Sequence, residues 1–340
     1  MKIKENYSLK SLNTFGLKVD AKYFTEVASL DEIKQAAEFV QKRAVPLLVL
    51  GGGSNILFVN NFSGLVLRNN LKGISMIDEA KGSVIVKVMG GEVWDDFVKF
   101  SVENGLGGVE NLSLIPGSVG AGPIQNIGAY GIEIKDSFVE LEAYFWKTGE
   151  TKTFLKKECE FGYRNSIFKK ELKGEIIIIS VTFRLDKKPI LKTDYGAIEN
   201  ELAAIANRKV TVQDVRDAII KIRRSKLPDP NELGNAGSFF KNPVVSSAKL
   251  SELKTEFPEI ASYKQPDGCY KLAAGWLIDK CGWKGIRTGD AGVHKRQALV
   301  LANYGKASGK DILNLAKKIR ESVVNKFGVD LEMEVNVVNS

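Results

Sequence analysis

Two glycine-rich segments are the residues of this chain whose type and spacing most directly indicate chemistry. The first, GGGSN at residues 51–55, follows the short apolar run PLLVL. The second, residues 105–131, holds eight glycines in 27 residues, set among apolar rather than charged neighbours. A strand that runs straight into glycines can bring backbone N–H groups close to a diphosphate. Together the two segments predict a large dinucleotide bound in an extended conformation.

Neither segment matches a common nucleotide-binding motif. Ile56 stands where a GxGxxG pattern needs its last glycine, and no GK[ST] follows the triple glycine. The Rossmann fingerprint and the Walker A loop are therefore both excluded. For residues 51–55 alone, a plain turn is the ordinary alternative. The second glycine-rich segment is what favours a cofactor loop.

Three polar residues in unusual local settings are candidate catalytic groups. Arg164 lies in GYRNSIFK, and Ser238 follows a glycine and precedes two phenylalanines. Glu334 lies in a segment where aliphatic residues alternate with polar ones. Each has an ordinary structural alternative. Arg164 suits a surface ion pair, Ser238 a helix cap, and Glu334 a solvated strand position. From the residue types alone these alternatives stay open.

The histidine and cysteine content excludes several kinds of site. His294 is the only histidine, and zinc catalysis and Ser-His-Asp triads usually need one. An enzyme with this sequence therefore needs another proton donor. Cys159, Cys269 and Cys281 form no CxxC pair, which disfavours a zinc ribbon or a disulfide scaffold. We expect no metal site and reduced thiols in the cytoplasm.

Length and charge set further limits. The 340 residues predict two or three domains. The 49 Lys+Arg exceed the 41 Asp+Glu by eight, a surplus that suits a small anionic substrate. The densest basic clusters, at residues 221–226 and 317–320, fall within helical periodicity, so no nucleic-acid partner is expected. No apolar run reaches the roughly 18 residues of a membrane helix, and no signal peptide is apparent, which predicts a cytoplasmic protein without membrane insertion.

Hydrophobic periodicity and capping boxes predict a mixed α and β chain. Helices are expected at residues 29–43, 94–105, 211–226 and 272–281, and from residue 308 onward. Strands are expected at residues 46–50, 66–68, 83–89, 138–146, 151–155, 176–185, 297–303 and 331–338. Residues 235–243 are expected to form a polar and aromatic loop.

Several motifs together resemble the UDP-N-acetylenolpyruvoylglucosamine reductase family. They are NTFGL (13–17), LGGGSNILF (50–58), ENLSLIPGSVGAGPIQNIGAYG (110–131), GYRNSIFK (162–169), KLPDP (226–230), NAGSFFKNP (235–243), KLAAGWLID (271–279) and LEMEV (331–335). The resemblance runs from about residue 10 to residue 337. The combination of IPGSVGAGPIQNIGAYG with GSFFKNP is its most specific part.

The resemblance implies a fold and a reaction. The fold is the mixed α/β, FAD-binding fold of the vanillyl-alcohol-oxidase type, with subdomains at residues 1–70 and 71–215. A substrate-binding α/β domain at residues 216–325 and a C-terminal strand at 326–340 that contributes to the active site would follow. NADPH would reduce non-covalently bound FAD. The reduced flavin would pass a hydride to UDP-N-acetylglucosamine-enolpyruvate and give UDP-N-acetylmuramate for peptidoglycan synthesis. A monomer is expected.

The resemblance also implies roles for the three catalytic candidates. Hydride addition to the enol ether leaves negative charge on the carbon that bears the carboxylate, and this charge needs electrostatic stabilisation. Arg164 would supply it, because its charged planar fork suits a carboxylate. Glu334 would be a second stabiliser if it were protonated and donating. Ser238 would be the general acid, with Lys241 or a water supporting its hydroxyl.

Cofactor and substrate contacts are implied for further residues. At the FAD diphosphate they are Gly51, Gly52, Gly53, Ser54 and Asn55. Along the rest of FAD they are Ile115, Pro116, Gly117, Gly120, Gln125, Asn126, Gly128, Ala129, Tyr130 and Gly131. Near the substrate diphosphate they are Arg223, Lys226, Asn242 and Gln297. Tyr195 lies in KTDYGAIENEL, which resembles the loop of one family subtype whose tyrosine folds over the substrate.

Two other functions compete with this one. Another flavin oxidase on the same fold often tethers FAD through a histidine, but His294 is far in sequence from the glycine segments. A non-catalytic nucleotide-binding or RNA-binding module would need a basic stripe with interleaved aromatics, and no such stripe is apparent in the sequence.

Overall fold

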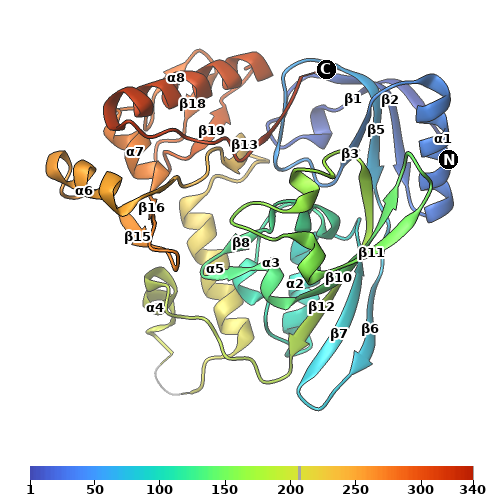
Figure 1. The fold of residues 1–340 in the computed structure, drawn as a ribbon, viewed down its shortest axis with the longest axis horizontal. Coiled ribbons are helices and arrows are strands. Elements are labelled where there is room, and N and C mark those ends of the chain that lie inside the picture. Colours follow the sequence, from blue (N-terminus) through green and yellow to red (C-terminus); the bar gives the residue numbers. More distant parts are fainter. Residues whose placement is uncertain (206–207, 340) are drawn as a thin grey trace. The chain divides into compact units, whose positions relative to one another are not determined.

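The triple glycine at residues 51–53 ends a segment of one structural unit, and Ser54 begins a segment of another. The computed structural model describes residues 1–205 and 208–339 (Figure 1). The first unit comprises Met1–Tyr7, Ala21–Gly53 and Ser63–Ser225, and the second comprises Ser8–Asp20, Ser54–Phe62 and Lys226–Ser340. Each unit thus draws on segments far apart in the sequence. The domain boundaries expected after residues 70, 215 and 325 stay a prediction.

A four-stranded sheet opens the first unit. Its strand order is β1 (Lys4–Ser8), β2 (Asp20–Val27), β5 (Phe62–Asn69) and β3 (Leu47–Leu50). Helix α1 (Leu30–Arg43) begins where the Ser29 hydroxyl accepts a hydrogen bond from the Glu32 amide, at 3.2 Å. Strands β3 and β5 are parallel and pair Leu50 with Arg68. The residues that follow these two strands therefore lie at the same edge of the sheet.

A five-stranded antiparallel sheet forms the rest of the first unit's scaffold. Its order is β11 (Thr151–Leu155), β10 (Phe138–Phe145), β12 (Ile176–Asp186), β7 (Ser83–Met89) and β6 (Ile74–Glu79). Helix α2 (Trp94–Glu103) buries Trp94 and Phe97 against Phe183 of β12, with the two phenylalanine rings 4.7 Å apart. This apolar contact fixes α2, and with it the chain that follows.

The second glycine-rich segment folds as a series of short turns. They are η2 (Glu110–Leu112), η3 (Val119–Ala121) and η4 (Pro123–Gln125), followed by the hairpin of β8 (Gly128–Ala129) and β9 (Ile132–Glu133), and then by α3 (Ile134–Ser137). The two hairpin turn residues, Tyr130 and Gly131, have φ values of 49° and 83°. Two-residue hairpin turns require such positive values. Further on, α4 (Gly196–Leu202) and α5 (Val212–Lys226, yellow in Figure 1) share one apolar cluster.

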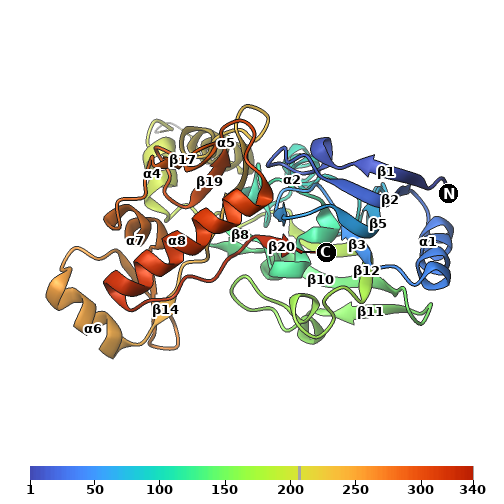
Figure 2. The same cartoon turned by 90° about the horizontal axis from the view of Figure 1, so that it is seen from above.

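Within the described residues, the second unit contains a four-stranded sheet, a three-stranded sheet, one parallel pair of strands and three α-helices. One sheet has the order β13 (Gly234–Ser238), β19 (Val300–Asn303), β18 (Ala291–Val293) and β17 (Arg287–Thr288), and the other β14 (Val244–Val245), β16 (Tyr270–Leu272) and β15 (Ser262–Lys264). The helices are α6 (Ser247–Glu256), α7 (Ala274–Lys280) and α8 (Gly309–Phe327). Figure 2 shows α8 beside α7, and α8 also packs on β18 and β19. Strand β4 (Ile56–Phe58) pairs in parallel with β20 (Asn336–Val338).

Most expected elements are confirmed, but the strand expected at residues 297–303 begins only at Val300, and two further elements differ. Strands β7 and β11 have the expected bounds, and α1, α2, α5 and α8 lie where capping and periodicity place them. Residues 235–243 are not wholly a loop, because β13 runs through Ser238 and pairs with β19. The expected strand at 331–338 is shorter, since only Asn336–Val338 joins a ladder while Met333 makes an isolated bridge with Phe240. None of the described helices is long and apolar enough to cross a bilayer.

Candidate active site

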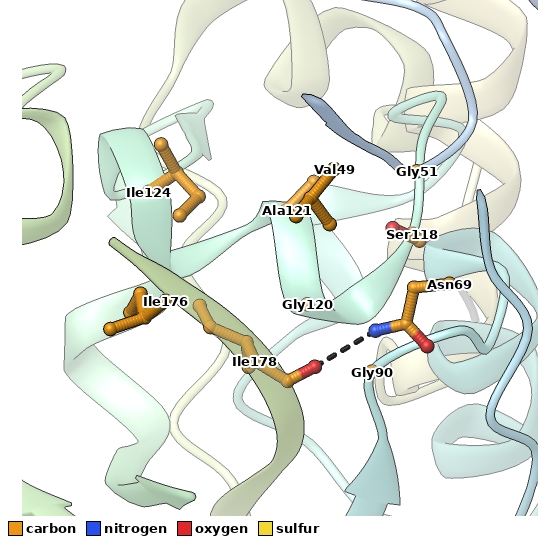
Figure 3. A pocket seen from close by; sticks show the side chains of 10 residues that line it. All are labelled: Val49, Gly51, Asn69, Gly90, Ser118, Gly120, Ala121, Ile124, Ile176 and Ile178. Atoms are coloured by element: carbon orange, nitrogen blue, oxygen red, sulfur yellow. Dashed lines mark hydrogen bonds between the residues drawn. The ribbon is translucent and has the colours of Figure 1, made fainter. Parts of the chain in front are cut away.

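A cavity of about 100 Å³ opens in the first unit where the two glycine-rich segments meet (Figure 3). It lies beyond the ends of β3, β5 and β7, and the side chains of Val49, Ile124, Ile176 and Ile178 give it apolar walls. The rest of its lining is the small or polar residues Gly51, Asn69, Gly90, Ser118, Gly120 and Ala121. The structure thus brings Gly51 of the first segment and Gly120 of the second to one cavity, as a shared ligand would require.

The glycines are needed here because the facing loops approach too closely for any side chain. A Cβ on Gly51 would lie 2.3 Å from the Ser118 hydroxyl oxygen, and one on Gly120 would lie 2.9 Å from the Gly90 carbonyl oxygen. Both distances are below those of real Cβ contacts. Bare backbone dipoles around a concave site suit the oxygens of a diphosphate. The cavity is smaller than the roughly 300 Å³ of a complete small-molecule site, so it fits one part of a dinucleotide such as FAD.

Asn69 and Gly90 are lining residues that the sequence analysis did not identify. The Asn69 side-chain amide donates to the Ile178 carbonyl at 2.8 Å and accepts from the Leu71 amide at 3.1 Å (Figure 3). Gly90 directly follows β7, just as Gly51 follows β3. In the sequence, this part of the site is marked by two consecutive glycines directly after an alternating strand. The triple glycine at residues 51–53 follows its strand in the same way.

Arg164, the first catalytic candidate, lies against the second glycine-rich segment. Its Nη2 donates a hydrogen bond of 2.5 Å to the carbonyl of Gly128. Its backbone has a φ of 51°, within a tight turn closed by the Gly162 amide and the Asn165 carbonyl at 3.0 Å. Left-handed backbone in a non-glycine residue costs free energy and is concentrated at functional sites. The turn therefore fixes the backbone of Arg164, and the hydrogen bond to Gly128 places its guanidinium group against the hairpin.

Asn126 supports the same region through hydrogen bonds of its side chain. It is fully buried, and its Nδ2 donates to Glu133 Oε2 and to the Gly162 carbonyl, both at 3.0 Å. Its side chain thus ties the hairpin to the turn that carries Arg164. Nearby, Gln125 accepts a long hydrogen bond of 3.5 Å from the Lys169 ammonium group. FAD contacts of Ala129, Gly131 and the other members of this segment stay a prediction.

A partly buried ion pair that the sequence did not reveal fixes the start of the loop holding Ile115, Pro116 and Gly117. Arg216 donates to both carboxylate oxygens of Asp95, at 2.7 and 2.9 Å. The Leu114 amide donates to the same carboxylate at 2.5 Å. Burial acts to raise the pKa of Asp95, but the hydrogen bonds from Arg216 and Leu114 outweigh it and hold the pKa below its usual value. The carboxylate therefore stays charged and anchors the loop.

Three predicted binding residues meet in a second cluster of the first unit. The rings of Tyr130 and Tyr195 pack edge to face, with centroids 5.4 Å apart. Arg223 faces Tyr130 closely enough for the two groups to interact electrostatically, and burial raises the pKa of Tyr130 and lowers that of Arg223. Among the described residues, the buried Nε of Arg223 has no hydrogen-bond partner. A cofactor candidate and two substrate candidates are thus brought together.

Ser238, the proposed acid, lies at a bulge in the second unit. Strands β13 and β19 pair Asn235 with Ala302 and Ser238 with Val300, so β13 holds one extra residue. Gly237 within the bulge has a φ of 68°, and its amide donates to Asn235 Oδ1 at 2.8 Å. Bulges of this kind re-aim the side chain that follows. The geometry accounts for the glycine before Ser238 in the GSFFKNP motif.

Glu334 lies on the segment next to the bulge. Its amide donates to the Phe239 carbonyl at 2.8 Å, so Glu334 pairs with the residue that follows Ser238. The Asn55 side chain donates to the Glu334 carbonyl at 3.3 Å. The structure therefore brings Ser238, Glu334 and Asn55 onto neighbouring segments of the second unit. The ammonium group of Lys241 forms an ion pair with Glu332 at 2.5 Å.

Two of the substrate candidates gather at the start of α7. Asn242 Oδ1 accepts a hydrogen bond from the Ala274 amide at 2.9 Å. Gln297 Oε1 lies 3.3 Å from the place of a Cβ on Gly275. Lys226 is exposed at the end of α5. The substrate contacts of these residues stay a prediction, as do the FAD contacts of Gly52, Gly53 and Ser54.

Known proteins match this chain over nearly its whole length. Residues 229–338 match the family model described as UDP-N-acetylenolpyruvoylglucosamine reductase, C-terminal domain, and residues 21–154 match the model described as FAD binding domain. The chain is 48% identical to the UDP-N-acetylenolpyruvoylglucosamine reductase of Flavobacterium johnsoniae, over 99% of this chain and 100% of that protein. It is 50% identical to the protein of the same name from Burkholderia pseudomallei, over 97% and 95% of the two chains.

Solved structures agree with these matches at the level of the fold. The crystal structure of UDP-N-acetylenolpyruvylglucosamine reductase from Thermus caldophilus superimposes with a TM-score of 0.71 at 24% identity, covering 100% of both chains. A 6-hydroxy-D-nicotine oxidase from Arthrobacter nicotinovorans gives a TM-score of 0.50 at 13% identity, over 97% and 86% of the two chains. The expected FAD-binding fold of the vanillyl-alcohol-oxidase type, followed by a C-terminal domain, is confirmed.

Proposed function

Because the chain belongs to the UDP-N-acetylenolpyruvoylglucosamine reductase family, we propose that it reduces UDP-N-acetylglucosamine-enolpyruvate to UDP-N-acetylmuramate for peptidoglycan synthesis. The observation that carries this function is sequence identity at about half of all positions over nearly the whole chain. Both the FAD-binding domain and the C-terminal reductase domain are matched. The cofactor is FAD, and NADPH is the electron donor.

FAD, when bound, would supply the hydride chemistry that links NADPH to the substrate. The residues suited to hold the FAD diphosphate are the glycines of the cavity, Gly51 with Gly120, and the adjoining Gly52, Gly53 and Ser54. Their support is the close approach of the two loops, which keeps side chains away from the cavity. Asp95 and Arg216 hold the second loop in place through Leu114.

Arg164 is proposed to stabilise the charge that develops on the substrate. Hydride addition to the methylene carbon leaves an enolate that is delocalised over the substrate carboxylate. A guanidinium group stays charged at every working pH and can donate two parallel hydrogen bonds to such a group. The hydrogen bond from Arg164 to Gly128 supports this role, because it fixes the guanidinium against the segment proposed to bind flavin.

Ser238 and Glu334 are proposed to complete the chemistry. Ser238 Oγ would donate its proton to the carbon that bears the carboxylate, which finishes the reduction. Glu334, if protonated, would donate a hydrogen bond to the enolate. The support is their placement: a bulge sets the direction of Ser238, and the Glu334 amide is bonded to the residue after it. Lys226, Asn242, Gln297 and Arg223 are proposed to bind the substrate nucleotide, and Tyr195 to cover it.

The oligomeric state and the cellular location are also proposals. We propose a monomer, which light scattering coupled to size-exclusion chromatography would test. We propose the cytoplasm as the location, because NADPH and nucleotide sugars are produced there, and fractionation with an antibody to the chain would test it. The alternative functions, another flavin oxidase of this fold or a non-catalytic nucleotide-binding module, are disfavoured by the full-length similarity to the reductases.

Product analysis tests the proposed function. The purified protein is incubated with NADPH and UDP-N-acetylglucosamine-enolpyruvate, and the nucleotide sugar is identified by mass spectrometry. The expected product carries two more hydrogen atoms than the substrate, and one NADPH is consumed for each product molecule. NADPH oxidation that needs oxygen and leaves the sugar unchanged would instead indicate a flavin oxidase.

A further inference from the structure

Asn111 joins two segments that the proposed function uses separately. It is fully buried, and its Nδ2 donates one hydrogen bond to the Tyr130 carbonyl and one to the Lys192 carbonyl, both at 2.9 Å. Tyr130 is the turn residue of the hairpin formed by β8 and β9, and Lys192 lies three residues before Tyr195. A single amide group therefore holds the hairpin and the approach to Tyr195 together.

Burying this amide is costly, which indicates that Asn111 is present for the two hydrogen bonds that its side chain donates. Within the described chain, Asn111 Oδ1 is sealed from solvent and has no hydrogen-bond partner. A buried acceptor without a partner is unfavourable, so an apolar residue of similar size would be the more stable choice if only volume counted. What the amide adds is the pair of hydrogen bonds to Tyr130 and Lys192.

Tyr195 lies between two fixed points. Lys192 is held by Asn111 on one side, and helix α4 begins at Gly196 on the other. Helix α4 is itself anchored, because Ile198 packs in one cluster with Ile219 of α5, and Tyr130 packs against the same cluster. Tyr195 is the N-cap of α4, because its carbonyl accepts a hydrogen bond from the Ile198 amide at 2.6 Å. Only residues 193 and 194 therefore separate the two anchors, and the half-exposed Tyr195 ring contacts Tyr130.

We propose that Asn111 is a positioning residue that sets where Tyr195 can reach over the bound nucleotide sugar. The proposal rests on the proposed function and specifies how the substrate-covering tyrosine is held. With Asn111 in place, the segment keeps Tyr195 against the flavin hairpin, so little ordering remains when the substrate binds. Without the two hydrogen bonds, residues 192–195 sample more positions, and substrate binding must restrict them.

The first test compares Asn111→Ala with the unchanged holoenzyme. The KM for UDP-N-acetylglucosamine-enolpyruvate is expected to rise about tenfold, the factor that corresponds to about one net hydrogen bond. The rate of flavin reduction by NADPH, measured in the absence of the nucleotide sugar, is expected to stay unchanged. Asn104→Ala is the matched control, because Asn104 donates one hydrogen bond, to Phe100 at 2.8 Å, on the exposed end of α2. It should alter neither value.

The second test asks whether Asn111 acts through Tyr195. In a Tyr195→Ala background, Asn111→Ala should change the KM less than twofold, because the side chain that it positions is gone. Equal tenfold effects in both backgrounds would overturn the proposal. If Asn111→Ala loses flavin, the same comparison is made with Asn111→Ser, which retains one donor. Loss of flavin from both variants would assign Asn111 to the cofactor loop alone and would also overturn the proposal.

These outcomes separate this proposal from the proposed function. If the unchanged protein does not reduce the enolpyruvate, the proposed function fails, whatever Asn111 does. If it does reduce the enolpyruvate and the two substitutions are independent, only the positioning role fails.

Discussion

The side-chain amide of Asn55 donates a hydrogen bond to the main-chain carbonyl of Glu334, 3.3 Å away. The Asn55 carbonyl in turn accepts from both the backbone and the side-chain amide of Asn336, each at 3.1 Å. Directly after these contacts β4 and β20 pair in parallel. The last residue of the first glycine-rich segment and the proposed enolate stabiliser are therefore held by the same ladder, although 279 positions separate them in the sequence.

Replacing Ser238 should separate the two half-reactions. In Ser238→Ala the flavin should still be reduced by NADPH at the normal rate, because no proton is delivered to carbon in that step. Reoxidation by the enolpyruvate should slow by about 10²- to 10⁴-fold, the usual contribution of a general acid. Stopped-flow absorbance of the flavin measures both rates. If both half-reactions keep their rates, Ser238 is not the acid.

Gly237 should be required for the direction of Ser238 as well as for stability. Alanine at a φ of 68° costs about 1 kcal/mol of unfolding free energy, because left-handed backbone is unfavourable for a residue with a Cβ. Gly268→Ala is the matched control, since Gly268 is an exposed turn residue with a φ of 83° and open space around it. Denaturant unfolding should show similar losses for both variants. Only Gly237→Ala should slow reoxidation by the enolpyruvate, and equal effects on that rate would contradict a special role for the bulge.

The bulge and its strand also show where sequence patterns stop being informative. Helices α1 and α8 were predictable because their capping residues, Ser29 with Glu32 and Ser308 with Asp311, lie within four positions of each other. The residues of β13, GNAGS, show no alternation, so the sequence alone predicts a loop there. What makes it a strand is β19, which comes some sixty positions later and supplies the hydrogen-bonding partner. Pairing over such a distance leaves no mark in the local sequence.

The cavity glycines should control FAD affinity. In Gly120→Ala the new Cβ would lie 2.9 Å from the Gly90 carbonyl oxygen, so the loop must shift at the cavity wall. Overpacking of this kind costs about 1–3 kcal/mol, and we expect the Kd for FAD to rise at least about tenfold. Gly82→Ala, in the turn between β6 and β7 with nothing within 4 Å, should leave the Kd unchanged. Titration of flavin fluorescence against apoprotein measures both, and an unchanged Kd for Gly120→Ala would exclude this cavity as part of the FAD site.

The Asp95–Arg216 pair should stabilise the protein in a pH-dependent way. The folded pKa of Asp95 lies below its usual value of 3.8, so its contribution is fully present above that value and is lost as the pH falls through the folded pKa. Asp95→Asn should cost about 3 kcal/mol near neutral pH, because it leaves the buried Arg216 guanidinium with only neutral acceptors, the Ser113 hydroxyl among them, and no opposite charge. The difference from the unchanged protein should narrow below about pH 4.

Urea unfolding over this pH range measures that difference. Asp330→Asn is the control, because Asp330 pairs with Arg320 at the surface, and exposed pairs contribute less than about 1 kcal/mol. A loss for Asp95→Asn that stays constant down to the acid limit would show that its charge is not what stabilises the loop.

Some functional residues, like some elements of the fold, can be predicted from the local sequence, and others depend on contacts between distant segments. Gly51, Arg164 and Ser238 stand out in the sequence because each lies in an unusual local context. Asp95 and Arg216 do not, since each is an ordinary residue on an amphipathic helix, and their pairing depends on how α2 and α5 pack 121 positions apart. Asn111 is intermediate, because it lies in a recognisable motif but its two hydrogen bonds depend on the hairpin and on the segment before α4.

An anaerobic flavin spectrum tests the central claim most directly. The purified protein is titrated with NADPH until its flavin absorbance bleaches, excess NADPH is removed, and UDP-N-acetylglucosamine-enolpyruvate is then added. The account predicts a flavin spectrum that bleaches with one equivalent of NADPH and returns fully with one equivalent of the enolpyruvate, leaving UDP-N-acetylmuramate. A protein that binds no FAD, or a reduced flavin that the enolpyruvate does not reoxidise, would contradict it.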